Sequence, residues 1–480
     1  MFDFLLGNDA LSTIFAFILV LIPAVFIHEL GHFLAAKAVG ITILEFGIGF
    51  PPRLVRLFTY RGTEYTLNWL PLGGFVRPLG EDFVRPNENE EAHDREEARQ
   101  RGVEKMMTVN EAKPPARLLF LTGGALANFV LAVVLLMLAA LMGLPETVGA
   151  RVNVISLPAN SVLANSGLQA FDAIESINGE TFDDSGDFAR SLEALDGELV
   201  TLTVRRAEEP DAVQALTFTP DFSETAAAID THPLVAGVSV DSPAESAGLQ
   251  VGDLIMSFNG ETITNFPDLQ QRTRENVGQE VDLVLWRAGE IIETALVPRV
   301  DPPPGQGAMG IEVGDATINQ ALGLVYQEGA PQVELQSQPV GEAMTYSVNR
   351  IGEVVGLMAA LPGEIIRGTA EPEELRLASP LGVSQVGSFF LQESIQRNQP
   401  GLILEFVALI SIALGITNLL PIPPLDGGRI LFVIVEIVRG RPIAPEREGM
   451  VHLIGFALLL SLMVVTVLND IANPLTDLLR

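Results

Sequence analysis

The sequence contains no cysteine and few basic residues. The lack of cysteine excludes disulfide frameworks, Cys-ligated zinc or iron–sulfur sites and thiol catalysis. The chain contains 29 Lys and Arg residues and 60 Asp and Glu residues, which gives a net charge of −31. That balance argues against a nucleic-acid partner, because the phosphates would be repelled. Charged residues make up only 19%, hydrophobic residues 48%, and mean hydropathy is +0.34. These values exclude a disordered chain and indicate a membrane protein with more than one domain.

In keeping with this composition, the sequence contains four long stretches without formally charged residues. A helix of roughly 20 apolar residues crosses a bilayer core. Four such stretches in one chain favour membrane spans over buried helices of a soluble protein. The first stretch is also compatible with a cleavable signal peptide, but the preceding residues 1–10 carry no Lys or Arg and no small-residue cleavage site follows. The stretches are Leu11–Ile27, Leu118–Pro145, Phe406–Leu425 and Gly449–Asn469.

The charges of the connecting segments predict an orientation. Residues 38–115 contain ten Lys and Arg residues, and the segment 429–448 contains four Arg residues. Residues 145–320 instead carry 8 basic and 29 acidic residues. Because positively charged loops stay in the cytoplasm, both termini and the long middle region are expected on the outer side of the membrane.

The middle region contains an internal repeat. Asn160–Thr181 matches Asp241–Thr262 without a gap, so that Asn160 corresponds to Asp241 and every later position keeps this offset. An offset of that length indicates two tandem domains. Each copy has a Gly-Leu turn, a short apolar strand and an Asn-Gly turn.

The repeated pattern resembles the PDZ domain. The resemblance is close in the second copy and weaker in the first, where Val162 and Phe171 replace a Pro and a Gly. PDZ domains bind extended peptides at a sheet edge. For the first copy, steric shielding of the membrane site is an equal alternative.

The end of the first stretch carries a metal-binding pattern. His28-Glu29-Leu30-Gly31-His32 is an HExxH motif. On a helix, residues four apart share a face, so both imidazoles can reach one metal ion. Glu29 is placed to take a proton from water at that ion. The alternative is two structural histidines, but ionisable residues inside a membrane span are costly and usually functional.

A catalytic zinc site needs three protein ligands, and the third must come from another segment. The third apolar stretch ends in NLLPIPPLDGG, residues 418–428, whose prolines break a helix and whose glycines allow close backbone approach. Asp426 lies there without an obvious counter-ion and is the candidate third ligand. Its alternative role is that of an N-cap of the following helix. Asn418 can hold substrate backbone or an oxyanion, or satisfy carbonyl groups at the kink.

Together these motifs resemble the site-2 protease family of intramembrane zinc metalloproteases, in particular the bacterial regulator-of-sigma-E protease type with four spans and two PDZ domains. Residues 46–54, 65–80, 123–129 and 379–383 are also similar to segments of that family, so the resemblance covers nearly the whole chain. Pro51 and Gly124 depart from the family pattern, which concerns local backbone geometry and leaves the chemistry intact.

The resemblance implies roles for individual residues. His28, His32 and Asp426 would bind one zinc ion per chain, and Glu29 would be the general base and acid. Asn418 would contact substrate near the scissile bond, and Asn128 matches an asparagine of the family's second span that would also contact substrate.

A membrane-associated β-loop is expected at residues 65–80 by the same resemblance. Tyr65, Leu67 and Trp69 alternate with polar residues, as in an edge strand that could hold extended substrate backbone. The alternative is a surface hairpin that lies on lipid headgroups.

The expected function is hydrolysis of a peptide bond within a transmembrane segment, that is, regulated intramembrane proteolysis by a metalloendopeptidase of the cell (inner or plasma) membrane. Single-pass membrane proteins, such as a pre-trimmed anti-sigma factor or a remnant signal peptide, would be the substrates. A peptide or a substrate ectodomain would bind the PDZ domains on the extracytoplasmic side. The rival hypotheses are a catalytically inactive PDZ membrane scaffold and a metal transporter.

The expected fold is a polytopic α-helical membrane protein with two tandem PDZ-like α+β domains. Its expected parts are a first transmembrane helix (1–40), a β-loop region (41–115), a second transmembrane helix (116–145), two PDZ-like domains (146–225 and 226–315), an amphipathic helical linker (316–400), a third transmembrane segment (401–440) and a fourth transmembrane helix (449–470).

Overall fold

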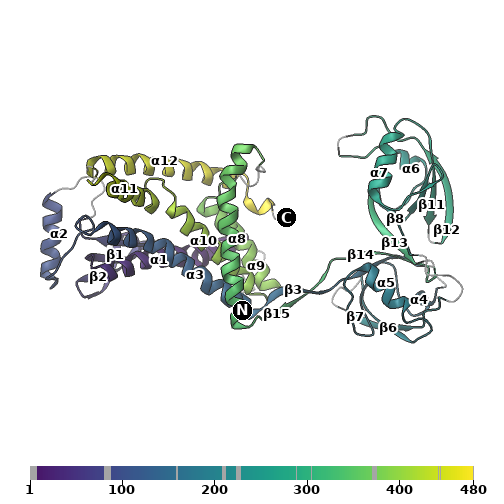
Figure 1. The fold of residues 1–480 in the computed structure, drawn as a ribbon, viewed down its shortest axis with the longest axis horizontal. Helices are drawn as coiled ribbons and strands as arrows, with labels where there is room; N and C mark the ends of the chain where they lie inside the picture. Colours follow the sequence, from purple (N-terminus) through teal and green to yellow (C-terminus); the bar gives the residue numbers. More distant parts are fainter. Residues whose placement is uncertain are drawn as a thin grey trace. The chain divides into compact units, whose positions relative to one another are not determined.

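The computed structural model divides the chain into two compact units (Figure 1). The first unit combines residues 1–144 with 336–480, and the second contains residues 145–335. The chain enters the second unit through strand β3 (Leu144–Gly149) and leaves it through β15 (Gln332–Gln336), and these two strands pair with each other. The structure describes residues 8–80, 88–157, 161–207, 212–222, 229–287, 289–303, 305–319, 321–369, 376–441, 443 and 445–478.

The first unit is mainly helical, and among its described residues four helices are long and apolar enough to cross a membrane. They match the four apolar stretches of the sequence, so the predicted polytopic helical fold is confirmed. Two shorter helices, α2 (Glu88–Gln100) and α11 (Asp426–Arg439), lie between spans in the sequence. The helices that contain the four candidate spans are α1 (Asp9–Val39), α3 (Pro114–Met142), α10 (Gly401–Leu419) and α12 (Pro445–Ala472).

Helices α1 and α3 approach each other closely through glycines. A Cβ atom added to Gly31 would lie 2.2 Å from the Gly123 carbonyl oxygen, and one added to Gly123 would lie 2.7 Å from the Ala35 Cβ. No side chain fits into such a space, so the two backbones meet only because these positions lack a Cβ atom. This contact joins the first and second candidate spans.

Strands β1 (Ile43–Tyr60) and β2 (Thr63–Pro78) fold into a small antiparallel sheet beside α1. Each strand bends, so that the first half of β2 pairs with both halves of β1. Tyr65, for example, lies opposite Phe58 on one side and Phe46 on the other. The expectation that residues 65–69 form an edge strand is therefore wrong. The outer ribbons of this sheet are residues 53–60 and 74–78.

The sheet buries several polar side chains and exposes many apolar ones, and Arg53 at its surface is exposed. Glu64, Thr66 and Asn68 are buried, and both Glu64 and Glu45 form ion pairs with Arg53. On the outside, Trp69 is 64% exposed. A charged network that is satisfied within the sheet, with apolar side chains around it, suits apolar surroundings. The other exposed apolar residues of this region are Leu54, Val55, Leu57, Phe58, Tyr60 and Leu70.

Two helices connect the second unit to the third span: α8 (Val340–Arg367) and α9 (Pro380–Gln396). Helix α8 packs against α3 and α10 and runs across them in Figure 1. On α8, the Tyr346 hydroxyl donates a hydrogen bond to Glu405 of α10 at 3.1 Å. This bond satisfies a carboxylate that lies within a candidate span.

The second unit contains one continuous antiparallel sheet that runs through both sequence repeats (Figure 1). Its strand order is β12-β11-β9-β8-β13-β14-β4-β5-β6-β7, and β10 pairs with β9. The strands of the first repeat are β4 (Val152–Ser156), β5 (Ala173–Ile177), β6 (Val200–Arg205) and β7 (Val213–Phe218), with helices α4 (Val162–Asn165) and α5 (Ser185–Glu193). The second repeat contains β8 (Ile229–Val238), β9 (Leu254–Phe258), β10 (Glu261–Thr262), β11 (Val281–Arg287) and β12 (Glu290–Leu296), with α6 (Pro243–Ser246) and α7 (Phe266–Glu275). They are followed by β13 (Ile311–Asn319) and β14 (Leu324–Glu328).

The repeat extends to individual hydrogen bonds. In the first copy, the buried carboxylate of Asp172 accepts the backbone N–H of Gln169 and pairs with Arg206. In the second copy, Asp253 accepts the N–H of Gln250 and pairs with Arg287. The same ion pair holds the Gly-Leu turn of each domain, so both copies have one fold despite the altered loop of the first.

One strand that follows both repeats in the sequence completes the first domain in the sheet. Strand β14 follows both repeats in the sequence, yet Leu324 and Tyr326 belong to the hydrophobic core of the first domain. The predicted domain limits at residues 225 and 315 stay a prediction. Strand β14 packs into the first domain although it follows both limits in the sequence.

We expect Gly31→Ala to lower the stability of the full chain, by about 1–3 kcal/mol, because the added methyl group would overlap the Gly123 carbonyl. Thermal unfolding in detergent micelles measures the change. Gly352→Ala is the matched control, because its added Cβ meets nothing within 4 Å and α8 gains helix propensity. Equal unfolding temperatures for the two variants would contradict this account of the α1–α3 contact.

Candidate metal centre

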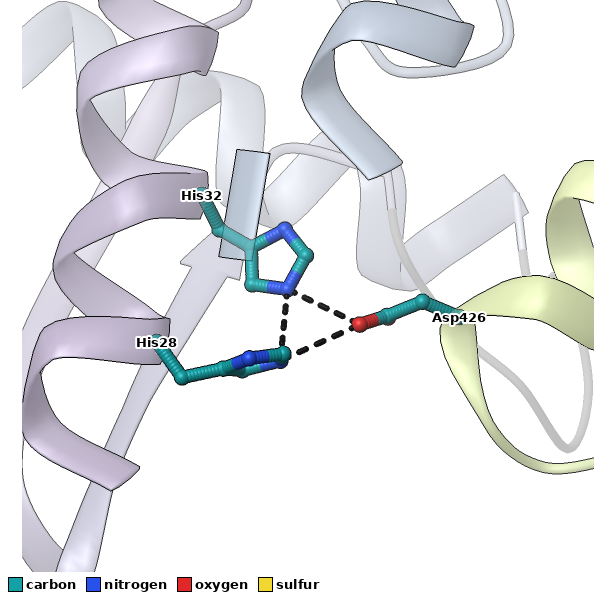
Figure 2. Close-up of side chains that lie close together, drawn as sticks. All are labelled: His28, His32 and Asp426. Atoms are coloured by element: carbon teal, nitrogen blue, oxygen red, sulfur yellow. Dashed lines mark hydrogen bonds and ion pairs between the residues drawn. The ribbon is translucent and has the colours of Figure 1, made fainter. Parts of the chain in front are cut away.

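His28 and His32 lie one turn apart on α1 and point toward the same space (Figure 2). Their Nε2 atoms are 3.1 Å apart, and both side chains are buried. Because residues four apart lie on one face of a helix, the HExxH spacing alone produces this pairing. Two ring nitrogens this close need either a shared proton or a shared cation.

Asp426 completes the cluster from a distant part of the chain. Its Oδ2 atom is 3.1 Å from the Nε2 atoms of both His28 and His32 (Figure 2). Asp426 is the first residue of α11, whose N-cap is Leu425 and has no side-chain cap bond. Asp426 is therefore not the N-cap of this helix, and its carboxylate faces the histidines.

The turn before Asp426 is held by close backbone packing. A Cβ atom added to Gly427 would lie 2.1 Å from the Leu420 carbonyl oxygen, and one added to Gly428 would lie 3.0 Å from that of Ile422. The two glycines thus let α11 begin directly against the proline-rich turn. This packing determines where the Asp426 carboxylate points.

The three side chains fit a zinc ion. Zinc–ligand bonds of about 2.0–2.2 Å in a tetrahedral arrangement place neighbouring ligand atoms about 3.3–3.6 Å apart, slightly farther than in this structure. The three ligand atoms here are separated by 3.1 Å in each pair. Two imidazole nitrogens and one carboxylate oxygen are donors that Zn²⁺ accepts, and three protein ligands leave a fourth position open.

Backbone and side-chain groups behind the histidines orient the rings. His32 Nδ1 lies 2.8 Å from the Phe120 carbonyl oxygen and donates to it, so that in the neutral imidazole Nε2 carries no proton and can bind a metal ion. His28 Nδ1 lies 3.4 Å from Nδ2 of Asn128, and the buried Oδ1 atom of Asn128 has no hydrogen-bond partner. Because the two ends of an amide are assigned from their hydrogen bonds, exchanging them puts Oδ1 beside His28, where it can accept from Nδ1–H.

Asn128 lies beside the metal-binding residues. It is 0% exposed and lies behind His28 in α3. Its assignment as a substrate contact stays a prediction, and the geometry instead favours a role in orienting His28.

Two neighbours of the centre could not be recognised as such in the sequence. The Phe120 carbonyl is a backbone group, so no residue type marks it. Gly124 was visible only as a departure from a family pattern, and an added Cβ atom there would lie 2.4 Å from His32 Nε2 and 2.7 Å from that of His28. Its lack of a side chain makes room for the imidazoles.

The remaining candidate residues are not part of the cluster of His28, His32 and Asp426. Glu29 is half-buried on α1, and a Cβ atom added to Gly74 of β2 would lie 3.6 Å from its Cγ atom. Asn418 donates a hydrogen bond to the Leu414 carbonyl of its own helix. Tyr65 is half-buried and Leu67 is part-buried within the β1–β2 sheet, and Trp69 is exposed. Substrate contact by these residues stays a prediction.

Comparison with known proteins shows the family. The profile of Peptidase family M50 matches residues 16–462. The zinc metalloprotease RasP of Oceanobacillus iheyensis is 30% identical over 477 residues, covering 96% of this chain and 99% of that protein. The regulator of sigma-E protease RseP of Escherichia coli is 26% identical, covering 95% and 98%. Among solved structures, the PDZ domain of an SdrC-like protein from Listeria monocytogenes is 20% identical, covers 17% of this chain and 86% of that one, and has a TM-score of 0.16.

The chain therefore belongs to Peptidase family M50. The predicted family, the site-2 proteases, and the predicted enzyme class, a metalloendopeptidase, are confirmed. The predicted combination of membrane helices with two tandem domains of mixed strands and helices is confirmed by the structure as well.

We expect Asn128→Leu to weaken zinc binding about 10–100-fold, because His28 loses the acceptor that orients its ring. Competition with a chromogenic chelator measures the affinity. Asn128→Asp keeps an acceptor at the same place and should restore binding. If both variants bind zinc as the native chain does, Asn128 has no role in orienting His28.

Proposed function

We propose that this chain is an intramembrane zinc metalloprotease that hydrolyses a peptide bond within the transmembrane segment of a membrane protein. The observation that supports it most strongly is the meeting of His28, His32 and Asp426 at 3.1 Å, with both histidines on a helix that can span the membrane. A zinc ion bound there would supply a Lewis acid that polarises the scissile carbonyl and lowers the pKa of a water molecule.

The residues of the chain carry the proton transfers. Glu29 follows the first ligand directly, so its carboxylate can take a proton from the attacking water and return it to the leaving amine. Asn418 lies in the last turn of α10, before the proline-rich turn that leads to Asp426. Its side-chain amide can donate to the substrate once it releases the Leu414 carbonyl. Asn128 and the Phe120 carbonyl would keep each His Nε2 atom free of protons.

The substrate backbone must be extended before it can react, because a helix occupies its carbonyl groups with hydrogen bonds four residues apart. The ribbon 74–78 of β2 is an outer ribbon of its sheet, and Gly74 lies against Glu29. We infer that this ribbon, rather than residues 65–69, pairs with the unwound substrate by strand addition. Tyr65, Leu67 and Trp69 would then contact lipid or substrate through side chains alone.

The distribution of charge along the chain supports a proposed orientation of the domains. Loops 38–115 and 429–448 carry the basic residues and would face the cytoplasm of a cell with this protein in its inner or plasma membrane. The acidic second unit would then lie on the extracytoplasmic side, where its PDZ-like domains can meet a peptide or the outer part of a substrate. Single-pass membrane proteins, including a pre-trimmed anti-sigma factor or a remnant signal peptide, fit a site of this kind.

The alternative function is a catalytically inactive PDZ membrane scaffold. It predicts no metal at the histidines and no effect of Glu29 on any activity. Measurement of the bound metal in the wild type and in ligand variants therefore separates the two functions.

We expect gently purified wild-type chain to contain about one zinc ion per chain, because two histidines and one carboxylate leave a site for a single ion. Elemental analysis of the detergent-solubilised protein measures it. His28→Ala and Asp426→Ala should each lose the metal, and Glu29→Gln should keep it.

The outcomes of that experiment separate the hypotheses. A folded wild type without metal would support the scaffold. Loss of zinc in the His28 variant alone would show that Asp426 is not a ligand.

We also expect cleavage of a synthetic signal peptide, labelled with a fluorophore and a quencher on either side of its apolar core, and no cleavage by Glu29→Gln. Replacing Gly and Pro of that core by Leu should slow cleavage severalfold, because the helix then unwinds less readily. Mass spectrometry locates the cut. Equal rates for both peptides would contradict the requirement for unwinding.

A further inference from the structure

The first unit has a cavity of about 490 Å³ at the N-terminal end of α1, apart from the metal centre. Its walls come from three segments that are distant in the sequence: the beginning of α1, one face of α9, and the residues that follow α12. The last of these segments includes the short 3-10 helix Leu475–Leu478. We call this space the α1–α9 cavity. In the orientation that the loop charges favour, this end of α1 is the extracytoplasmic one.

On α1, the cavity lies on the same face as the histidines of the metal centre. Ala10 and Ile14 line it, and each precedes one of these histidines, His28 and His32, by eighteen residues. Eighteen residues are five turns of 3.6 residues, so each pair lies along one side of the helix. The rise of about 1.5 Å per residue separates the cavity from the metal centre by about 27 Å along α1.

The side of α1 between the two sites is apolar. Phe17, Leu21 and Val25 continue the same face and are part-buried. Near the metal centre, a Cβ atom added to Gly73 of β2 would lie 2.4 Å from a Cγ atom of Val25, directly before the ribbon 74–78. One side of α1 therefore connects the ribbon that we infer to pair with substrate, the metal centre and the α1–α9 cavity.

The length of this path fits the apolar segment of a membrane-spanning substrate. A substrate cut at the metal centre would reach the cavity with about 8 further residues if fully extended, or about 18 if helical. The apolar core of a signal peptide has about 7–15 residues and is followed by small residues at its cleavage site. The residues beside the cavity would then be those at which the substrate leaves its apolar segment.

The lining of the cavity is polar in part and uncharged. Gln385, Ser388 and Gln392 line it from one face of α9, and Thr13 and Thr476 add two hydroxyl groups. None of the described residues that line the cavity carries a formal charge. Hydroxyl and amide groups both donate and accept hydrogen bonds, so such a lining can bind N–H and C=O groups alike.

Two of these side chains are held in place by the surrounding helices. The Gln385 amide donates to the backbone carbonyl of Asp470 in α12 at 3.3 Å, and its oxygen accepts the N–H of Leu475. Gln392 donates to the Ser12 hydroxyl of α1 at 2.8 Å. Asp470 is 0% exposed, so its carboxylate presents no charge to the cavity. The polar groups of the wall are thus oriented before any peptide arrives.

The end of a substrate helix needs such groups. The last turn of a helix has four carbonyl groups without partners inside the helix, and the first turn has four N–H groups without them. Hydroxyl and amide side chains can satisfy either set. A charged side chain at the same point would lose its hydration without gaining a partner of opposite charge, which is costly.

We propose that the α1–α9 cavity is an outer subsite of the protease: it binds the end of a substrate's apolar segment, where the helix gives way to small, uncharged residues, and it selects against a charge at that point. The inference rests on the proposed function and names one class of substrate for it, peptides with the composition of a remnant signal peptide. The ribbon 74–78 holds such a substrate near the cut, and the cavity holds its far end.

The first test compares labelled signal peptides that share one apolar core and carry Ala, Ser, Lys or Asp directly after it. Wild-type chain in detergent micelles should cleave the Ala and Ser peptides roughly tenfold faster than the Lys and Asp peptides, because a charge of either sign loses its hydration in the cavity. The same charges placed five residues farther out should have little effect. Equal rates for all four peptides would overturn the proposal. Slower cleavage of the Asp peptide alone would indicate repulsion by the acidic second unit and would overturn it as well.

Two adjacent substitutions assign the effect to the cavity. Ala10→Glu places a carboxylate at its wall and should raise the rate for the Lys peptide, relative to the Ala peptide, roughly threefold or more. Leu11→Glu is the matched control, because Leu11 is exposed, lies in the same first turn of α1 and does not line the cavity. A carboxylate suits the first turn of a helix in both variants, and thermal unfolding confirms that both are folded. An equal change of the rate ratio in both variants, or no change in Ala10→Glu, would contradict the proposal.

Cross-linking separates this subsite from the protease function. Chain with Glu29→Gln should bind the Ala peptide without cutting it. A diazirine-bearing residue directly after the apolar core should then react with residues 10–14 or 381–392, which mass spectrometry identifies, and one at the start of the core should not. Cross-links elsewhere, with cleavage by the wild type, would overturn the subsite and leave the protease function intact. Cross-links at the cavity without any cleavage by the wild type would support the binding site and contradict the protease function.

Discussion

The close approach of α1 and α3 is the constraint on which the metal centre depends. Gly31 and Gly123 bring the two backbones together, and Gly124 then leaves room for the paired imidazoles. The same approach places the Phe120 carbonyl and Asn128 behind the rings of His32 and His28. A side chain at any of these glycines would move the histidines away from Asp426, which arrives independently on α11. The chemistry of the site therefore rests on the absence of side chains as much as on the ligands.

The first unit also shows how polar groups are accommodated among apolar helices. In the β1–β2 sheet, buried carboxylates pair with an exposed guanidinium group, and many apolar side chains are exposed. At α8, a tyrosine hydroxyl satisfies the carboxylate of Glu405. In both places each of these ionisable groups has a partner within the protein, which is the arrangement required where water is scarce. The acidic second unit has the opposite composition, with many of its carboxylates in solvent.

Much of this architecture could be predicted from the sequence, because it depends on local patterns. The lengths of the apolar stretches predict the spans, the HExxH spacing predicts the histidine pair, and the gapless match of the two repeats predicts two similar domains. The role of residues 65–69 could not be predicted in this way. Alternation shows that a segment is a strand, but whether that strand is central or at an edge depends on how β1 and β2 bend and pair. The Phe120 carbonyl and β14 were missed for a related reason, since a backbone group and a strand shared between domains leave no mark on residue type.

The position of β14 has a consequence for biosynthesis. The first domain lacks its last strand until the whole of the second repeat has left the ribosome, since β14 follows both repeats in the chain. The second domain, in contrast, has all its strands once β13 is complete. The later domain in the sequence can therefore fold first, and the earlier one closes around a strand that arrives after it. Nascent chains that stop before residue 324 would expose the unfinished core of the first domain, including Val154 and Phe188.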